Sequence, residues 1–317
     1  MLDVKNLKVR FGNVEVVRGV SFNLNQGQIL SVIGESGAGK SVLAMSILKL
    51  YDERTASIQA DHLKYNGNDL LAYGEKDFLT LRGREIAYIF QNPTDALSPN
   101  KTIRSQVKEL CAVHGMTYVE RDVIKLFGDV GLEKEAEIVL NMYPKQLSGG
   151  LAQRVTIAMS LLLKPKLIIA DEPTSSIDAS LTKVIVNLLV NINKKYGIAV
   201  MFITHDIDLA LEISDKIMIM YGGLVMEYGE KNRFIDHPFH PYTQALMKCV
   251  KSIQSNESPL YTLQGYALDP SEFKSECPFA NRCSFKEGLC TMAIPEMSNR
   301  GVRCIKEISK EAYHDES

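Results

Sequence analysis

The stretch that decides the fold is Gly34-Glu-Ser-Gly-Ala-Gly-Lys40-Ser41. It matches the pattern Gly-x4-Gly-Lys-Ser at every position, follows the apolar run Gln28–Ile33 and precedes a helix-like segment. In this context the glycines allow backbone N–H groups to face a phosphate at the helix N-terminus. The flanking strand and helix patterns disfavour the alternative, a glycine-rich turn without a ligand. The sequence therefore predicts a phosphate-binding loop.

Short apolar runs predict the buried strands of a mostly parallel sheet. Helical patterns alternate with them, notably at Ser41–Leu50 and Gly150–Leu163, which favours an α/β fold. The segment Val4–Leu24 alternates polar and apolar residues, as an antiparallel strand pair does. The five predicted buried strands are Ile29–Ile33, Ile86–Phe90, Leu167–Ala170, Ala199–Ile203 and Lys216–Met220.

The pattern changes in two further regions. Residues 95–160 contain the helix-like stretches Arg104–His114, Val119–Val130 and Lys134–Met142, and they predict a helical insertion within the α/β core. After residue 236 the chain is interrupted by prolines, predicts one helix at Tyr242–Val250, and then becomes rich in loops and cysteines. We expect one domain at residues 1–236 and a C-terminal extension at 237–317.

Composition limits the classes of function. Apolar residues make up 45% of the chain, charged residues 23%, and the net charge is −2. There is no basic excess of the kind that nucleic-acid binding needs. No apolar stretch reaches the roughly 18–20 residues of a membrane span. The N-terminus lacks the apolar segment of a secretory signal, so we expect a cytoplasmic protein.

Two carboxylates follow the predicted strand Leu167–Ala170. Asp171 ends this strand, where a carboxylate can hold the Mg²⁺ of a bound nucleotide. Glu172 comes next and can orient or deprotonate an attacking water. Acidic pairs at strand ends are common, but together with a phosphate-binding loop this pair indicates nucleotide hydrolysis.

Six motifs in order resemble those of ATP-binding cassette (ABC) ATPases, over about residues 1–235. Leu147-Ser-Gly-Gly150, followed by Gln153-Arg154, resembles the family's signature motif. Gln91 resembles the Q-loop glutamine, and Ser175-Ser-Ile-Asp178 resembles the D-loop. His205 in Ile-Thr-His-Asp is similar to the switch histidine.

The resemblance implies a P-loop NTPase fold with an antiparallel β subdomain, and ATP and Mg²⁺ as ligands. It implies that Glu172, His205 and Gln91 serve catalysis, and that Ser41, Gln91 and Asp171 hold Mg²⁺. Two such domains close head to tail, so the signature of one contacts the nucleotide of the other. The nucleotide-binding residues implied are Phe11 (stacking on adenine), Gly34, Ser36, Gly37, Ala38, Gly39, Lys40, Ser41, Gln91, Ser148, Gly149, Gly150, Asp171 and Asp178. Two departures from the family pattern are Leu151, where glutamine is usual, and Phe11, where tyrosine is usual.

The flanking sequences resemble the oligopeptide/dipeptide/nickel branch of ABC importers. They are Arg82-Gly-Arg-Glu-Ile-Ala-Tyr-Ile-Phe-Gln91-Asn-Pro, Tyr143-Pro-Lys-Gln-Leu-Ser, His240-Pro-Tyr-Thr-Gln-Ala-Leu246 and Cys277-Pro-Phe-Ala-Asn-Arg-Cys283. The first of these resembles the D-type ATPase of such systems, which pairs with a distinct F-type ATPase.

This branch implies an ATPase at the cytoplasmic face of the membrane that drives peptide uptake. Its implied partners are a second ATPase subunit, two permease subunits and an extracytoplasmic substrate-binding protein. Import of nickel or a metal chelate is an open alternative. A soluble ABC ATPase in translation or DNA repair is disfavoured by the single cassette, the absence of heptads and the slightly negative charge.

Four of the six cysteines, Cys277, Cys283, Cys290 and Cys304, lie in the C-terminal extension. A reducing compartment disfavours disulfides, and the spacing differs from the Cys-x2-Cys of a zinc ribbon. Four thiolates also suit an iron–sulfur cluster, and the family resemblance implies a 4Fe-4S cluster here. The alternative is that these cysteines are free and structural. Cys111 and Cys249 are better interpreted as small core residues.

Overall fold

In the computed structural model, the glycine-rich stretch connects a buried strand to a helix. The strand β3 (Ile29–Ile33) is buried along its whole length, and α1 (Lys40–Ile47) begins directly after Gly39. The structure describes residues 1–175, 177–236, 238–255 and 261–306.

The chain divides into two units. Unit 1 comprises Met1–Tyr73 and Ile203–Ser317, and unit 2 comprises Gly74–Phe202. The C-terminal extension therefore belongs to the same unit as the phosphate-binding loop.

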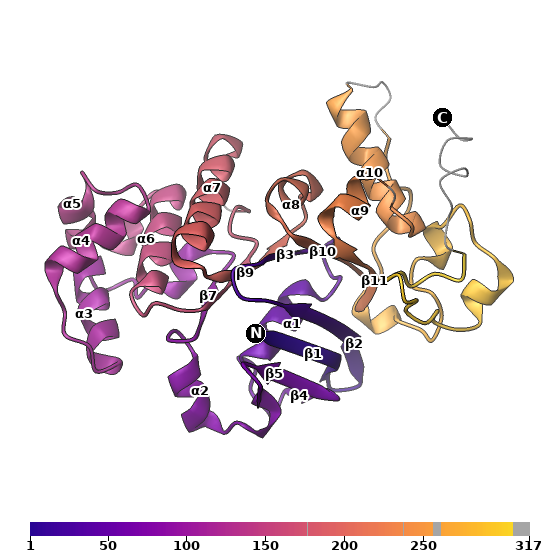
Figure 1. Ribbon diagram of the computed structural model, residues 1–317, viewed down its shortest axis with the longest axis horizontal. Coiled ribbons are helices and arrows are strands. Elements are labelled where there is room, and N and C mark those ends of the chain that lie inside the picture. Colours follow the sequence, from indigo (N-terminus) through magenta and orange to yellow (C-terminus); the bar gives the residue numbers. More distant parts are fainter. Residues whose placement is uncertain (176, 237, 256–260, 307–317) are drawn as a thin grey trace. The chain divides into compact units, whose positions relative to one another are not determined.

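An antiparallel sheet forms the first part of unit 1 (Figure 1). β1 (Leu2–Phe11) pairs with β2 (Val14–Leu24) on one side and with β4 (Ala56–Gln59) and β5 (His62–Tyr65) on the other. A short strand, β6 (Asn68–Asp69), pairs with β5. Buried residues alternate with exposed or partly exposed ones along much of β1, as expected for a sheet with one covered face.

A second group of strands in unit 1 contains β3, β10 (Lys216–Tyr221) and β11 (Leu224–Glu230). β10 runs parallel to β3 and antiparallel to β11. The turn between β10 and β11 is Gly222-Gly223, with φ of 55° and 75°. Positive φ at both central residues is the requirement of a two-residue type I′ hairpin, which glycine meets without strain.

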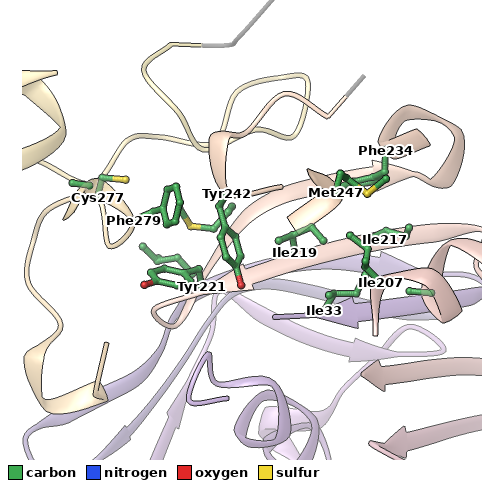
Figure 2. Packing of buried hydrophobic residues seen from close by; sticks show 14 of the residues in the cluster. Ile33, Ile207, Ile217, Ile219, Tyr221, Phe234, Tyr242, Met247, Cys277 and Phe279 are labelled. Carbon is green, nitrogen blue, oxygen red and sulfur yellow. The ribbon is translucent and has the colours of Figure 1, made fainter. Parts of the chain in front are cut away.

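The helices of unit 1 pack against its two groups of strands. They are α1, α8 (Ile207–Ile213), α9 (Lys231–Asp236) and α10 (Pro241–Gln254). One buried cluster joins β3, β10, α8 and α10 to the C-terminal extension (Figure 2). Within it the rings of Tyr221 and Tyr242 lie 4.8 Å apart, and that of Phe279 lies 5.6 Å and 5.2 Å from them. The extension is thus packed into the core of unit 1.

Unit 2 contains buried strands and most of the helices. β7 (Ile86–Ile89) pairs in parallel with β8 (Leu167–Asp171), and β9 (Ala199–Thr204) ends at the boundary with unit 1. β8 and β9 are fully buried, as expected for parallel strands covered on both faces. The helices are α2 (Glu75–Leu81), α3 (Ile103–Val113), α4 (Glu120–Asp129), α5 (Ala136–Asn141), α6 (Gly149–Leu161) and α7 (Ala179–Tyr196) (Figure 1).

The remaining regular elements are short 3-10 turns. They lie at Leu70–Ala72, Pro93–Ala96, Pro144–Gln146, Pro270–Glu272, Ala280–Arg282 and Gly288–Thr291. Among the described residues, no helix is both long and apolar enough to span a membrane.

The predicted strands and helices agree with the structure to within a few residues. All five predicted buried strands are present, and the early antiparallel pair is β1 and β2. Residues 95–160 contain α3, α4, α5 and most of α6, without a strand.

Candidate nucleotide site

The glycines of the phosphate-binding loop have distinct structural roles. Gly37 and Gly39 have φ of 81° and 93°, a region that L side chains rarely adopt. At Gly34 a Cβ atom would lie 2.3 Å from the carbonyl oxygen of Met220 in β10. The loop therefore needs glycine for its curl at two positions and for its close approach to the strand at a third.

Lys40 lies at the start of α1 and its side chain turns back into the loop. The residue is only 5% exposed, and its Nζ atom donates to the carbonyl oxygens of Gly34 (2.8 Å) and Glu35 (3.1 Å). Ser41 is partly exposed next to it, Ala38 is buried, and Ser36 is exposed on the loop. The ammonium is thus held inside the backbone curl, beside the N-terminus of an eight-residue helix, where a phosphate group is favoured.

Phe11 ends β1 in unit 1. Its ring meets that of Tyr51 edge to face, with centroids 4.9 Å apart and planes at 87°. The two rings form an aromatic pair at the end of β1. The sequence predicts only Phe11 of this pair.

The acidic pair lies at the end of β8 in unit 2. Asp171 is 5% exposed, and its Oδ2 atom accepts a hydrogen bond from the Tyr88 hydroxyl at 2.7 Å. Glu172 is less buried and has a φ of 43°. Its carbonyl oxygen accepts hydrogen bonds from both the backbone N–H and the hydroxyl of Ser175, so the turn after the strand is well defined.

Gln91 and His205 each follow a buried strand by one or two residues. Gln91 is exposed beyond the end of β7, in unit 2. His205 is exposed directly after β9, in unit 1. The residue after it, Asp206, caps α8 by accepting from the backbone N–H of Leu209 at 3.1 Å. The cap fixes where the chain turns after His205.

The signature segment forms the N-terminus of α6 in unit 2. Ser148 is the N-cap, and its hydroxyl accepts from the backbone N–H of Leu151 at 3.4 Å. Ser148 and Gly149 are exposed, whereas Gly150 is buried. A Cβ atom on Gly150 would lie 2.8 Å from the Leu181 side chain of α7, so glycine permits the two helices to approach. An exposed helix N-terminus carrying a hydroxyl suits an anionic ligand from another molecule.

The D-loop precedes α7. Asp178 is exposed and is the N-cap residue of this 18-residue helix, and its carbonyl oxygen accepts from the backbone N–H of Leu181. Ser176, within the same motif, lies outside the described residues.

The predicted residues are thus divided between the units. Unit 1 carries Phe11, the loop Gly34–Ser41 and His205. Unit 2 carries Gln91, the Ser148–Gly150 segment, Asp171, Glu172 and Asp178. Each lies at the end of a strand or the start of a helix, where functional side chains of α/β proteins gather.

Comparison with known proteins decides the family. Residues 17–175 match the family described as ABC transporter, and residues 226–290 match the oligopeptide/dipeptide transporter C-terminal region. The chain is 37% identical over 305 residues to a probable peptide ABC transporter ATP-binding protein of Sinorhizobium fredii, covering 94% of this chain and 91% of the relative. It is 36% identical over 305 residues to the dipeptide transport ATP-binding protein DppD of Escherichia coli, covering 94% and 93%. The chain belongs to the ABC transporter ATPases of the dipeptide and oligopeptide family.

Solved structures of other ABC ATPases share the fold. The dimeric structure of MJ0796, described as a bacterial ABC transporter cassette, superposes with a TM-score of 0.63 at 26% identity, covering 73% of this chain and 99% of that one. A post-hydrolysis dimer of MJ0796 bound to ADP and phosphate has the same TM-score at 25% identity and the same coverage. The predicted α/β ABC ATPase fold is confirmed.

The C-terminal region of this ABC ATPase brings its four cysteines into one neighbourhood. Burial raises the pKa of the Cys277 thiol to about 11, and Cys290, Cys304 and Cys283 each raise it further. Burial also raises the thiol pKa of Cys283 and Cys304. Among the described residues, however, no group of three or more His, Cys, Asp or Glu side chains is arranged to hold a metal ion. The thiols are near one another but do not form a ligand set for a single ion.

Several residues of this ABC ATPase that contact the predicted site were missed by the sequence prediction. Tyr88 contacts Asp171, and Tyr51 contacts Phe11. Arg282 and Tyr242, from the C-terminal region, contact Glu35 in the phosphate-binding loop. Arg282 lies 247 positions from Glu35, so no local pattern could have revealed the pair.

Proposed function

We propose that this ABC ATPase uses Gly34–Ser41 to bind the phosphates of ATP and supplies the energy for peptide uptake. The observation that carries the proposal is the Lys40 ammonium, buried inside the loop and hydrogen-bonded to two of its carbonyl oxygens. A fixed cation among backbone N–H groups suits the β- and γ-phosphates. Ser36, Gly37, Ala38 and Gly39 form the rest of this cradle, and Phe11 stacks on the adenine.

Magnesium and water are assigned to the carboxylates and their neighbours. In this proposal Ser41, Gln91 and Asp171 hold the Mg²⁺ shell, which neutralises charge on the phosphates. Glu172 orients and deprotonates the attacking water, and His205 contacts the γ-phosphate. Supporting this assignment are the hydrogen bond that fixes the Asp171 carboxylate and the defined turn that follows Glu172.

We propose that two ATPases close head to tail around the nucleotides. Ser148, Gly149 and Gly150 of one subunit then contact the γ-phosphate bound to the other, and Asp178 lies along the seam. The support is an exposed, hydroxyl-capped helix N-terminus and the similarity to a dimeric cassette. The second subunit is proposed to be a distinct F-type ATPase.

Lys40→Ala tests the phosphate-binding loop. Because the phosphates lose their buried cation, ATP affinity should fall by about 10²-fold or more, consistent with the loss of charge-assisted bonds. Titration with a fluorescent ATP analogue at physiological salt measures the change, with Lys49→Ala, in the same unit but outside the loop, as a control. Retained ATP affinity in Lys40→Ala would contradict the assignment.

The proposed cargo is an oligopeptide or dipeptide, because the named relatives are peptide transport proteins and the C-terminal region matches that family. The chain would act at the cytoplasmic face of the membrane with two permease subunits and an extracytoplasmic substrate-binding protein. Exposed apolar side chains on unit 2, including Val113 and Ile138, support a protein contact there.

ATP-driven uptake by the complete complex in proteoliposomes tests the cargo. We expect accumulation of a labelled dipeptide or short peptide that requires ATP and is abolished by Lys40→Ala. Uptake of a nickel chelate without any peptide uptake would overturn the peptide assignment and leave the ATPase assignment standing.

We propose that Cys277, Cys283, Cys290 and Cys304 are the place for the 4Fe-4S cluster that the family resemblance implies. The support is that the cysteines lie in one neighbourhood of the C-terminal region, where the backbone N–H of Cys277 donates to the carbonyl oxygen of Cys290 at 2.9 Å. Their described arrangement does not fit a single metal ion, whose tetrahedral thiolate site, with Zn–S of about 2.3 Å, needs sulfur atoms about 3.8 Å apart. A cluster binds each thiolate through a different iron atom and needs wider spacing.

Iron and acid-labile sulfide analysis of anaerobically purified protein tests the cluster. We expect close to four iron atoms and four sulfide ions per chain, because a 4Fe-4S cluster contains four of each. Protein without iron or sulfide would leave the cysteines as free structural residues.

A further inference from the structure

The second residue of the phosphate-binding loop is held by the C-terminal region. Two guanidinium nitrogens of Arg282 meet the two carboxylate oxygens of Glu35, at 2.7 Å and 3.1 Å. The side chains are only 8% and 26% exposed. A bidentate pair shielded from water is stronger and more directional than a surface ion pair.

The backbone of the same loop residue is held by a second part of that region. The N–H of Glu35 donates to the hydroxyl of Tyr242 in α10 at 3.3 Å. Tyr242 is fully buried, and its ring packs against those of Tyr221 and Phe279 (Figure 2). Because its ring is fixed by this packing, the position of its hydroxyl is fixed as well.

The orientation of Arg282 is set by contacts on every side of its guanidinium. Its Nε donates to the carbonyl oxygen of Gln264 at 2.8 Å, Nη1 also donates to the Tyr221 hydroxyl at 3.1 Å, and Nη2 reaches the Leu263 carbonyl oxygen at 3.5 Å. Burial disfavours the charge, but the hydrogen bonds to Glu35 and Tyr221 outweigh it and raise the pKa of Arg282. The side chain is therefore a permanently charged, pre-oriented group.

Glu35 in turn touches the lysine that binds phosphate. The carbonyl oxygen of Glu35 accepts from Lys40 Nζ at 3.1 Å, so the backbone at Glu35 helps to hold the ammonium together with the carbonyl oxygen of Gly34. The Glu35 carboxylate is also an anion on a loop that must bind a polyanion. An unpaired carboxylate there would repel the phosphates of ATP, and the paired guanidinium offsets that repulsion.

We propose that the C-terminal region is part of the ATP site, with Arg282 and Tyr242 as positioning residues that hold Glu35 and thereby the phosphate-binding loop. Neither residue contacts the nucleotide. Arg282 neutralises the Glu35 carboxylate and fixes its direction, and Tyr242 fixes its backbone. This inference rests on the proposed role of Gly34–Ser41 in binding phosphate.

The test is a double-mutant cycle on Glu35 and Arg282. Arg282→Met should weaken ATP binding by about tenfold, because it leaves a carboxylate unpaired beside the phosphates. Glu35→Gln combined with Arg282→Met should regain most of the affinity, since the repelling charge is gone. Arg282→Lys should be intermediate because lysine keeps the charge without the bidentate geometry. The effect should appear in the Kd and KM for ATP, with kcat little changed.

Tyr242→Phe supplies an independent arm. It removes only the oxygen that accepts from Glu35 N–H, so we expect a loss in ATP affinity of a few fold with an unchanged melting temperature. If Arg282→Met does not fold, Tyr242→Phe still tests whether the C-terminal region positions the phosphate-binding loop.

The outcomes separate this inference from the assignment on which it rests. Unchanged ATP affinity in Arg282→Met and Tyr242→Phe, while Lys40→Ala loses binding, would overturn the inference alone. A double mutant as impaired as Arg282→Met would reduce Arg282 to a structural residue and also overturn it. Retained binding in Lys40→Ala would instead overturn the role of the loop.

Discussion

Glu172 adopts a left-handed backbone conformation, with φ of 43°, which is uncommon for a residue with a side chain. Such conformations cost about 1–3 kcal/mol and occur frequently at functional sites. Glu172 lies directly after the buried Asp171, so this backbone conformation sets the direction in which its side chain leaves the strand. Lys49 and Lys164 have similar φ values of 45° and 55°, so the backbone defines the local turn at Glu172, and its proposed catalytic role rests on the motif.

Glu172→Gln should separate ATP binding from hydrolysis. Glutamine keeps the shape of the side chain but cannot accept a proton from water, so turnover should fall by about 10²–10⁴-fold. ATP affinity should remain close to that of the wild type, and the closed dimer should accumulate. Steady-state phosphate release and nucleotide titration measure the two quantities, and normal turnover in the variant would refute Glu172 as the base.

His240 predicts an acid-sensitive stability. Burial lowers the pKa of His240 to about 3, and its Nδ1 accepts from the backbone N–H of Tyr242 at the start of α10. Between about pH 6.5 and pH 3 the unfolded chain therefore binds more protons than the folded chain. The contribution of neutral His240 to the free energy of unfolding is fully present above this range and is lost as the pH falls through it. The slope is at most about 1.4 kcal/mol per pH unit. The charged neighbours are Glu227, whose carboxylate accepts from the backbone N–H of His240, and Arg303.

His240→Asn is the matched variant, because asparagine can accept the same capping bond without titrating. Urea unfolding at pH 7.5 and pH 5 should show the wild type losing more stability than the variant. Parallel pH dependence in the two proteins would exclude His240 as the source.

At the level of single residues, the sequence predicted the motif residues but not their contacts. Lys40 and Asp171 could be identified because the motif and the preceding apolar strand are local patterns. Arg282 could not be connected with Glu35, nor Tyr88 with Asp171, because each pair meets only after distant segments fold together. Long-range contacts depend on tertiary packing, for which a single sequence carries no periodic signal.

Among the elements, buried parallel strands were predicted best. β3, β8 and β9 are covered on both faces and read as continuous apolar runs, which few other structures produce. β11 was missed because its second half is polar and partly exposed. The Gly222-Gly223 pair that starts it is a hairpin signal that the sequence did contain.

Gly34→Ala tests the fit between the phosphate-binding loop and β10. The new Cβ would lie 2.3 Å from a backbone oxygen of Met220, so either the strand or the loop must move. We expect a loss of about 1–3 kcal/mol in the free energy of unfolding, as for overpacked sites, together with weaker ATP binding. Gly288→Ala is the control, since a Cβ there meets nothing within 4 Å. Equal stability and ATP affinity in the two variants would show that the close approach is not required.

At the scale of the whole molecule, the exposed start of α6 bears on the proposal that each subunit supplies only part of an ATP site. Ser148 and Gly149 are exposed, which suits a contact made by a second ATPase. A subunit that presents its signature outward should therefore bind ATP alone but hydrolyse it only in a pair.

Ser148→Arg distinguishes ATP binding by the isolated chain from ATP hydrolysis by the paired subunits. Because Ser148 is exposed, its replacement should cost only about 1 kcal/mol of helix capping and leave ATP binding to the isolated chain almost unchanged. In the Glu172→Gln background, ATP should no longer trap a closed dimer, with this chain or with the partner ATPase, because the arginine occupies the contact with the facing nucleotide. In otherwise unmodified protein, hydrolysis should fall by about 10²-fold or more as the γ-phosphate loses the helix N-terminus.

Size-exclusion chromatography with light scattering measures the trapped dimer, and nucleotide titration measures binding to the chain. Thr117→Arg, an exposed position in the same unit, controls for the added charge and should behave like the parent. Lys40→Ala should lose ATP binding and the dimer together, whereas Ser148→Arg should lose only the dimer. If Ser148→Arg still formed the ATP-trapped dimer and hydrolysed ATP normally, the signature segment would not complete a neighbouring site, and the chain would have to contain a whole one.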